Sequence, residues 1–326
     1  MRVVSAALSA LEAVATFVAT VFGARGVLAT GTALGLVAWG LQAGRRRILD
    51  EELARLPTLK GSATRSRAVR RSFIQFYTRL FENSFFGSLS PRLLSRLTEL
   101  EGKANLDQAL LRGRGVILLL SHFGAFLLPL AVLAHAGYSV RQLAGKPVLR
   151  SRLAEAVWKW RVRSYSRLPL QFIRIGRFLR PAFEALHRNE VVAIAFDGRD
   201  ARRFVPVPMF GRRVLVSTSP MELARRTGAA IVPAFVVRGA DGRCRVILDA
   251  YFTVPNDSSS EHDAVAEAVG RFAALFERYV LRYPCHYGIV LERMRMDAQA
   301  GVATPFFDPT DDRLPAGLSA GEESHT

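Results

Sequence analysis

Short apolar runs alternate with helical stretches along most of the chain, and this alternation restricts the fold more than any other feature. From residue 106 onward, runs with the length and apolar content of strands recur at 116–120, 138–143, 170–173, 191–196, 230–237, 245–248 and 287–291. Helices are predicted at 125–136, 151–165, 178–189 and 261–281. A capping box at Ser219–Glu222, with proline at its first helical position, predicts one more helix start. The pattern predicts an α/β fold with a mostly parallel sheet covered by helices.

An uncharged segment of nearly membrane-spanning length lies near the N-terminus. Residues 26–44 contain no charged side chain, and three arginines follow at 45–47. A membrane span needs about 20 apolar residues, and cationic loops stay on the cytoplasmic side. We therefore predict a membrane-anchoring helical segment within residues 1–44, with the three arginines on its cytoplasmic side. A buried hairpin in a soluble core is the alternative, and Glu12 would make a second crossing by residues 3–24 costly.

Charge and periodicity divide the rest of the chain. Residues 45–296 are predicted to form one α/β domain, and residues 297–326, in which acidic side chains outnumber basic ones, are predicted to be a disordered acidic tail. Apolar positions at helical spacing in 73–81 follow a cluster of arginines at 65–71. This helix is either a core helix with a solvated basic start or an interfacial helix with its cations on lipid headgroups.

The chain is strongly basic, with 45 Lys and Arg against 28 Asp and Glu and a net charge of +17. A charge of this size indicates an acidic partner, which is an anionic membrane, a nucleic acid, an acidic carrier protein or a phosphorylated substrate. No nucleic-acid recognition motif is visible, so a nucleic acid is the least favoured of these partners.

The number of cysteines and the motifs present exclude several further classes of protein. The two cysteines, Cys244 and Cys285, exclude a disulfide scaffold and a cysteine-rich zinc site. The sequence has no glycine-rich phosphate loop and no His/carboxylate spacing typical of a metal site. Cys285 has no local activating group and is a poor nucleophile. We expect no metal and no bound cofactor.

A histidine follows the first apolar run at the point where a strand is predicted to end. Ser121-His122-Phe123-Gly124 lies between the run at 116–120 and the next helix. Functional groups in open α/β sheets gather at the carboxyl ends of strands. There His122 would act as a general base near neutral pH, and neighbouring backbone N–H groups would hold a developing oxyanion. A structural histidine at a strand end is the alternative.

The same segment resembles the first block of the lysophospholipid acyltransferase superfamily, and most closely the branch of lauroyl/myristoyl acyltransferases of lipid A biosynthesis. In that branch a strand runs into His-Phe-Gly, and a carboxylate follows five residues after the histidine. Further similar segments are 100–102, 112–117, 191–197, 204–211, 217–220 and 226–235. The resemblance covers roughly residues 30–295.

The resemblance implies transfer of an acyl chain from an acyl-ACP or acyl-CoA thioester to a hydroxyl of an anionic glycolipid or lysophospholipid. His122 would be the base. Ser121, Phe123 and Gly124 would contact the substrate. The carboxylate would orient the imidazole and stabilise the imidazolium.

The sequence departs from the family pattern at that carboxylate, because the position falls on Leu127. No Asp or Glu occurs from residue 108 to residue 154, so no neighbour takes its place. Three explanations stay open. Asp197 or Asp200 replaces the acid from a distance, His122 works unassisted, or the protein is a non-catalytic homologue that binds lipid. Residues 287–294 also differ from the aromatic strand and His-Arg-Arg-Trp that usually close the family pattern.

Two arginines are predicted to bind an anionic group of the acceptor. Arg174 follows the run at 170–173, and Arg199 lies in the loop after Asp197. Guanidinium groups suit phosphate and carboxylate. The alternative for both is a solvated loop arginine, and for Asp197 it is a turn or capping role.

Overall fold

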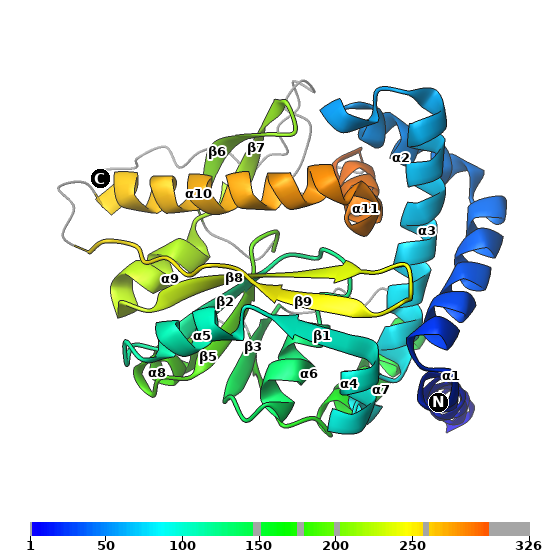
Figure 1. Cartoon of the computed structure of the whole chain (residues 1–326), viewed down its shortest axis with the longest axis horizontal. Helices are drawn as coiled ribbons and strands as arrows, with labels where there is room; N and C mark the ends of the chain where they lie inside the picture. Colours follow the sequence, from blue (N-terminus) through cyan, green and yellow to red (C-terminus); the bar gives the residue numbers. More distant parts are fainter. Residues whose placement is uncertain (1, 146–150, 175–178, 199–202, 257–260, 300–326) are drawn as a thin grey trace.

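A central sheet organises the protein, whose computed structural model describes residues 2–145, 151–174, 179–198, 203–256 and 261–299 (Figure 1). In these residues the sheet has seven strands in the order β1-β9-β8-β2-β5-β3-β4. The strands are β1 (Thr98–Glu101), β2 (Val116–Leu120), β3 (Val140–Ala144), β4 (Leu170–Arg174), β5 (Val191–Ala195), β8 (Ala230–Arg238) and β9 (Cys244–Leu248). Neighbouring strands run parallel except β8 and β9. The predicted α/β fold with a mostly parallel sheet is confirmed.

Helices cover both faces of this sheet. They are α4 (Pro91–Leu97), α5 (Lys103–Leu110), α6 (Leu128–His135), α7 (Arg152–Tyr165), α8 (Arg180–His187), α9 (Ser219–Thr227) and α10 (Glu261–Arg282). Every residue of β2 is buried, and alternate side chains point to opposite faces. Ile117 and Leu119 join one core cluster with α8, α9 and α10. Val116, Leu118 and Leu120 join a second cluster with α4, α5 and α6. This double cover explains why the strands read as apolar runs.

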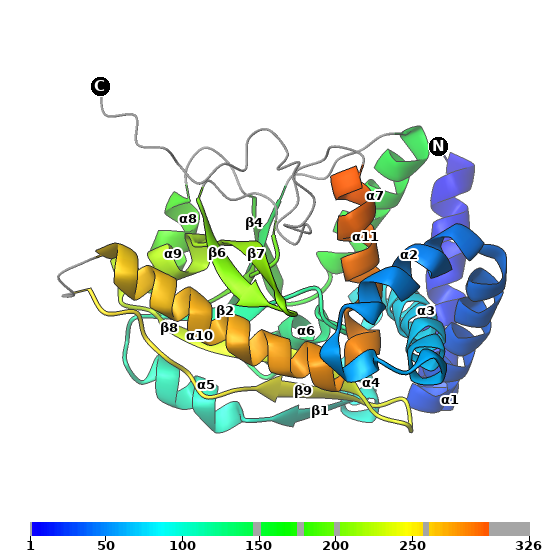
Figure 2. The same cartoon turned by 90° about the horizontal axis from the view of Figure 1, so that it is seen from above.

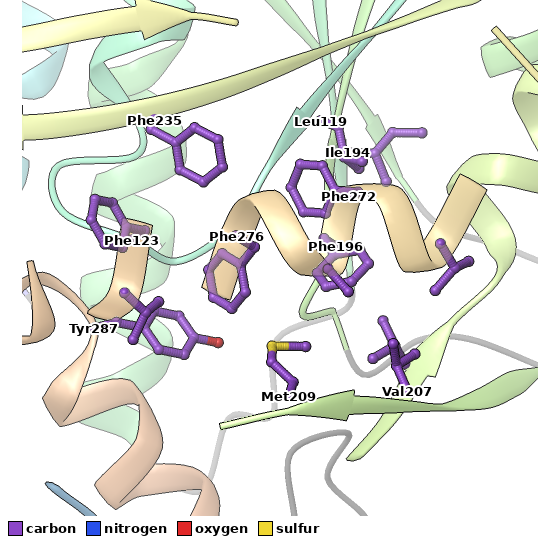
Figure 3. Packing of buried hydrophobic residues seen from close by; sticks show 14 of the residues in the cluster. Leu119, Phe123, Ile194, Phe196, Val207, Met209, Phe235, Phe272, Phe276 and Tyr287 are labelled. Carbon is purple, nitrogen blue, oxygen red and sulfur yellow. The ribbon is translucent and has the colours of Figure 1, made fainter. Parts of the chain in front are cut away.

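An aromatic cluster fills the space between the sheet and α10 (Figure 3). Phe272 and Phe276 of α10 pack on Phe196, at centroid distances of 4.5 and 6.0 Å. A two-stranded antiparallel hairpin, β6 (Phe204–Met209) and β7 (Arg212–Ser217), lies on the other side of α10 and adds Val207 and Met209 to this core.

Three N-terminal helices stand at one end of the sheet in both views (Figures 1 and 2). They are α1 (Arg2–Leu41), α2 (Ala43–Ala54) and α3 (Ser62–Ser84). Gly23 interrupts α1 with φ 61° and ψ −151°, so the helix has two arms. The second arm packs along α3. Gly31 lies against Thr78, and a Cβ added at Gly35 would be 2.6 Å from the Cα of Ile74. Glycine is required where the two backbones approach this closely.

The predicted strand at 287–291 is wrong. A short 3₁₀ turn, η3 (Pro284–His286), leads into α11 (Gly288–Gln299). Buried positions include Tyr287, Leu291 and Met294, which is helical spacing, and a short apolar run cannot by itself separate a strand from a buried helix. Helix α11 also includes residues 297–299, which the sequence assigned to the tail. The remaining tail residues lie outside the described residues.

Other predicted elements lie within a few residues of the observed ones. The helix expected at 125–136 starts later, at Leu128, with a proline in its first turn. Thr218, rather than Ser219, is the N-cap of α9, and its hydroxyl donates to Glu222 at 2.6 Å. Strand β1 and the β6–β7 hairpin were not among the expected elements, because their polar residues and prolines hide the strand pattern.

The close approach of α1 and α3 leads to a stability prediction. We expect Gly35→Ala to destabilise the protein by about 1–3 kcal/mol, because the new methyl group meets backbone atoms that cannot move aside. Gly40→Ala on the same helix is the control, since nothing lies within 4 Å of a Cβ there. Thermal unfolding in one detergent measures both. Equal melting temperatures for the two variants would contradict the observed packing.

Candidate active site

The candidate site lies where two neighbouring parallel strands end. Strand β2 leads directly into Ser121 and His122, and β5 leads into the loop that carries Asp197. The strands pair with Leu120 opposite Ala195, so their carboxyl ends lie side by side. Ligand sites in open α/β sheets form at this edge.

The structure brings His122 and Asp197 into direct contact. The ring Nδ1 of His122 lies 2.9 Å from Oδ1 of Asp197. The backbone N–H of His122 donates to Oδ1 at 3.2 Å and to Oδ2 at 3.0 Å. The Asp197 side chain is 0% exposed and that of His122 is 41% exposed. One buried carboxylate therefore orients both the ring and the backbone of the histidine, and Nε2 is the ring nitrogen that it does not contact.

Asp197 is stabilised in its charged form. Burial by itself raises the pKa of this carboxyl, but the charge of His122 and the hydrogen bonds from His122 and Tyr287 outweigh burial and hold the pKa below its ordinary value. An ionised Asp197 accepts the Nδ1 proton, so in the neutral ring the lone pair is on Nε2. This is the tautomer that a general base requires.

The backbone of the loop after β2 is already hydrogen-bonded. The N–H of His122 donates to Asp197, and the N–H of Gly124 donates to the carbonyl of His286 at 3.0 Å. Gly124 has φ +58°, and a Cβ there would collide with the carbonyl of Val236. Both N–H groups thus already donate hydrogen bonds within the protein, whereas the sequence predicted that such groups would be free to hold an oxyanion.

Arg79 of α3 lies behind the same loop. Its Nη1 donates to the carbonyl of His122 at 3.1 Å. Burial lowers the pKa of Arg79 to about 10, with Asp197 acting in the opposite direction, so the group stays charged at neutral pH. Its guanidinium lies 5.1 Å from the ring centroid of Phe76 and 5.6 Å from that of Phe126. Phe126 also packs edge-on against His122 at 4.7 Å.

The residues that flank His122 differ in how accessible they are. Ser121 is buried, and its hydroxyl has no hydrogen-bond partner among the described residues. Phe123 is 1% exposed and stacks on His286 at 5.3 Å. Phe123 thus contributes to the core beneath the loop, and His122 is the exposed member of the motif.

The predicted arginines are only partly described. Arg174 is the last residue of β4, at the same sheet edge as His122, because β4, β3, β5 and β2 are parallel. Its side chain, together with Arg199 and Asp200, lies outside the described residues. The proposed contacts of these groups with an acceptor remain predictions.

Leu127 is a core residue. It is 7% exposed, caps the start of α6 and belongs to the hydrophobic cluster on that face of the sheet. The polar partner of the His122 ring comes instead from β5.

The cysteines and His286 are held in neutral forms. Burial raises the pKa of Cys285 to about 11 and that of Cys244 to about 12. Burial lowers the pKa of His286 to about 3, and its Nε2 accepts a hydrogen bond from the N–H of Arg238 at 3.0 Å. Within the described part of the chain, no group of three or more His, Cys, Asp or Glu side chains could hold a metal ion.

Sequence reasoning missed two residues that contact the pair. Arg79 reaches the loop from α3, and Tyr287 donates to Asp197 from the end of η3. Residue spacing gives no signal for either one, because both contacts join distant segments. For Tyr287, the only signal was that its segment differs from the usual family pattern.

A partly exposed histidine held by a buried carboxylate at the carboxyl edge of a parallel sheet is an arrangement suited to proton transfer. The family model described as bacterial lipid A biosynthesis acyltransferase matches residues 1–296, and the chain belongs to this family. No match was found among curated proteins. Family membership indicates transfer of an acyl chain to a lipid.

The position of Leu127 leads to a second prediction. We expect Leu127→Glu to destabilise the protein without raising activity, because the new carboxylate would be buried in an apolar cluster while Asp197 already holds Nδ1 of His122. Leu127→Met keeps the side chain apolar and is the control, with an expected loss below about 1.5 kcal/mol. Thermal melts and an acyl-transfer assay measure the outcome. A more active glutamate variant would show that the site needs a local acid.

Proposed function

We propose that the protein transfers a fatty acyl chain from an acyl thioester to a hydroxyl of an anionic glycolipid or lysophospholipid at a membrane surface. The observation that carries the proposal is the contact between Nδ1 of His122 and the buried Asp197, with the His122 side chain 41% exposed. The proposal includes the lauroyl/myristoyl branch of the family, which the first block of motifs resembles.

The chemistry needs one base and no bound cofactor. Nε2 of His122 takes the proton of the acceptor hydroxyl as its oxygen attacks the carbonyl carbon of the thioester. Asp197 stabilises the imidazolium that forms. The tetrahedral intermediate then collapses, the C–S bond breaks, and the imidazolium returns its proton to the departing thiolate. An ester and a free thiol are the products.

Charge supports the choice of donor and acceptor. Acyl carrier protein and coenzyme A are both acidic, and the chain has a net charge of +17. Arg79 carries a buried positive charge beside His122, and Arg161 and Arg293 are close enough to lower its pKa. A phosphate on the acceptor lipid would offset this concentration of positive charge.

Helix α1 supports membrane association. Among the described helices, Ala6–Leu41 is long and apolar enough to span a membrane by length and composition. Large apolar side chains of α1 stay exposed, including Leu11, Val14, Phe17, Val21, Phe22, Leu34, Val37 and Leu41. A lipid surface is the environment in which such a stripe is stable. We propose the inner membrane, cytoplasmic face, as the location, with residues 1–44 as the anchor of an acyltransferase domain at 45–296.

The first arm of α1 is joined to the body of the protein through Glu12. Its carboxylate is buried, forms an ion pair with Arg167, and accepts hydrogen bonds from Ser88 and Ser164, each at 3.0 Å. A paired and hydrogen-bonded carboxylate removes much of the cost of placing Glu12 in an apolar helix. These contacts support an arrangement in which the first arm lies against the domain with its outer face toward lipid, and in which residues 3–24 do not form a separate crossing.

A catalytically inactive lipid-binding homologue is the alternative, and Leu127 in place of the expected acid is the observation that favours it. The two functions differ in one measurement. With radiolabelled acyl thioester and membrane lipids, His122→Ala is expected to lose about 10²- to 10⁴-fold in rate. Asp197→Asn is expected to lose up to about 10⁴-fold, because an amide at this position favours the wrong ring tautomer.

His187→Ala is the control for these variants, because His187 is exposed on α8 and away from the pair. It should retain the wild-type rate. If wild type and His122→Ala transfer acyl chains equally well, His122 has no part in the reaction. If wild type transfers none to any membrane lipid, the inactive alternative holds.

The exposed stripe on α1 leads to a fourth prediction. We expect Phe17→Asp combined with Val21→Asp to release the protein from anionic vesicles, since an aspartate within an apolar helix costs about 2.5–3.5 kcal/mol at the centre of a bilayer. Leu111→Asp is the control, because Leu111 is 86% exposed but lies between α5 and β2. Vesicle flotation measures binding. Equal flotation of both variants would show that α1 does not contact the membrane.

A further inference from the structure

Asp197 has a second side-chain partner besides His122. The hydroxyl of Tyr287 donates to Oδ2 of Asp197 at 2.7 Å, while Oδ1 lies against Nδ1 of His122. Tyr287 is 0% exposed. The two oxygens of one carboxylate are thus held from two sides, by a ring from the end of β2 and by a phenol from the start of α11.

We propose that Tyr287 is a positioning residue for the reaction, which holds Asp197 in the orientation that aligns the ring of His122. This inference rests on the proposed function and deepens it. Tyr287 would not touch the substrate, because it is fully buried and acts through the carboxylate.

A positioning residue is needed because Asp197 lies far from His122 along the chain. Asp197 and His122 are 75 positions apart, so no shared helix or turn sets the angle between them. Without Tyr287, the described side-chain and backbone contacts of the carboxylate would come from His122 alone, through its ring and its backbone N–H. A donor from a separate segment holds Oδ2 independently of the His122 loop, and it adds a hydrogen bond to an oxygen that burial cuts off from water.

Tyr287 is suited to the role of donor. Burial raises the pKa of its hydroxyl well above the usual value, and the charge of Asp197 acts in the same direction. The phenol therefore keeps its proton across the working pH range. The charge of Arg79 also acts on Tyr287, and it lowers the pKa of the hydroxyl.

The tyrosine is itself held in place. Its ring packs edge-on against Phe276 of α10 at 4.9 Å, next to Met209 and Phe123 in the aromatic cluster (Figure 3). The next residue, Gly288, lies so close to α3 that an added Cβ would be 2.6 Å from the hydroxyl of Ser72. Farther along α11, the buried Glu292 accepts hydrogen bonds from Arg45 at 2.7 and 2.8 Å. Helix α11 is thus fixed against both α2 and α3, and the phenol has a rigid base.

Tyr287→Phe tests the inference, because it removes the hydroxyl and keeps the aromatic ring. We expect kcat to fall about 10- to 100-fold with KM little changed, by analogy with the loss of groups that orient a functional side chain. We also expect the acid limb of the pH–rate profile to move to higher pH, because the hydrogen bond from Tyr287 is one of the interactions that hold the pKa of Asp197 below its ordinary value. A purely structural hydroxyl would not move the pH profile.

Tyr279→Phe is the matched control. Tyr279 belongs to the same aromatic cluster, stacks on Phe235 at 3.8 Å, and contacts a different carboxylate, that of Asp249, at 3.5 Å. Its loss of a hydroxyl should leave kcat and the pH profile unchanged. In an Asp197→Asn background, Tyr287→Phe should have no further effect on kcat, because the tyrosine acts through the aspartate.

A proton NMR measurement separates this inference from the proposed function. The Nδ1 proton of His122, bonded to a buried carboxylate, should give a downfield resonance in the wild type that is absent in His122→Ala and Asp197→Asn. This resonance should shift or broaden in Tyr287→Phe, and it should keep its wild-type position in Tyr279→Phe. If it shifts as expected but no variant transfers acyl chains, the positioning role stands and the proposed function fails. An unchanged resonance in Tyr287→Phe, or an unchanged kcat and pH profile, overturns the inference.

Discussion

The carboxylate of Asp197 connects the parts of the protein that make up the candidate site. It accepts from the backbone and ring of His122 at the end of β2 and from Tyr287 at the start of α11, and it lies within the electrostatic reach of Arg79 on α3. A fully buried charge is unfavourable unless its hydrogen bonds are satisfied. The chain meets this requirement with donors from several elements, so the position of each element depends on the others. The geometry of the histidine is therefore a property of the tertiary structure and not of one short motif.

The N-terminal helices connect the same site to the proposed membrane contact. Helix α3 carries Arg79, and it also lies against α1 at Gly31 and Gly35. The outer face of α1 exposes its large apolar side chains. The helix that supports the loop of His122 is thus the neighbour of the helix that would meet lipid.

The fold could be predicted largely from the sequence, because strands buried on both faces leave apolar runs such as Val116–Leu120. The prediction failed at Tyr287–Leu291, where a short apolar run forms the start of a helix, and it missed the proline-containing hairpin β6–β7. In the site, His122 followed from its place after a strand, and Asp197 was one of two distant acids that the family resemblance placed near it. Arg79 and Tyr287 were not predictable, since their contacts depend on how α3 and α11 pack, which no local spacing encodes. The side chains of Arg174 and Arg199 lie outside the residues that the structure describes.

The separation of the two members of the pair along the chain has a consequence for biosynthesis. His122 and Asp197 meet only after β5 has been added beside β2, and Tyr287 arrives later still, with the last helix. An unfinished polypeptide carries the imidazole without its carboxylate. Under the proposed function, a truncated product that ends before β5 would lack the carboxylate partner of its base, and docking of the C-terminal helix would complete the alignment of that carboxylate.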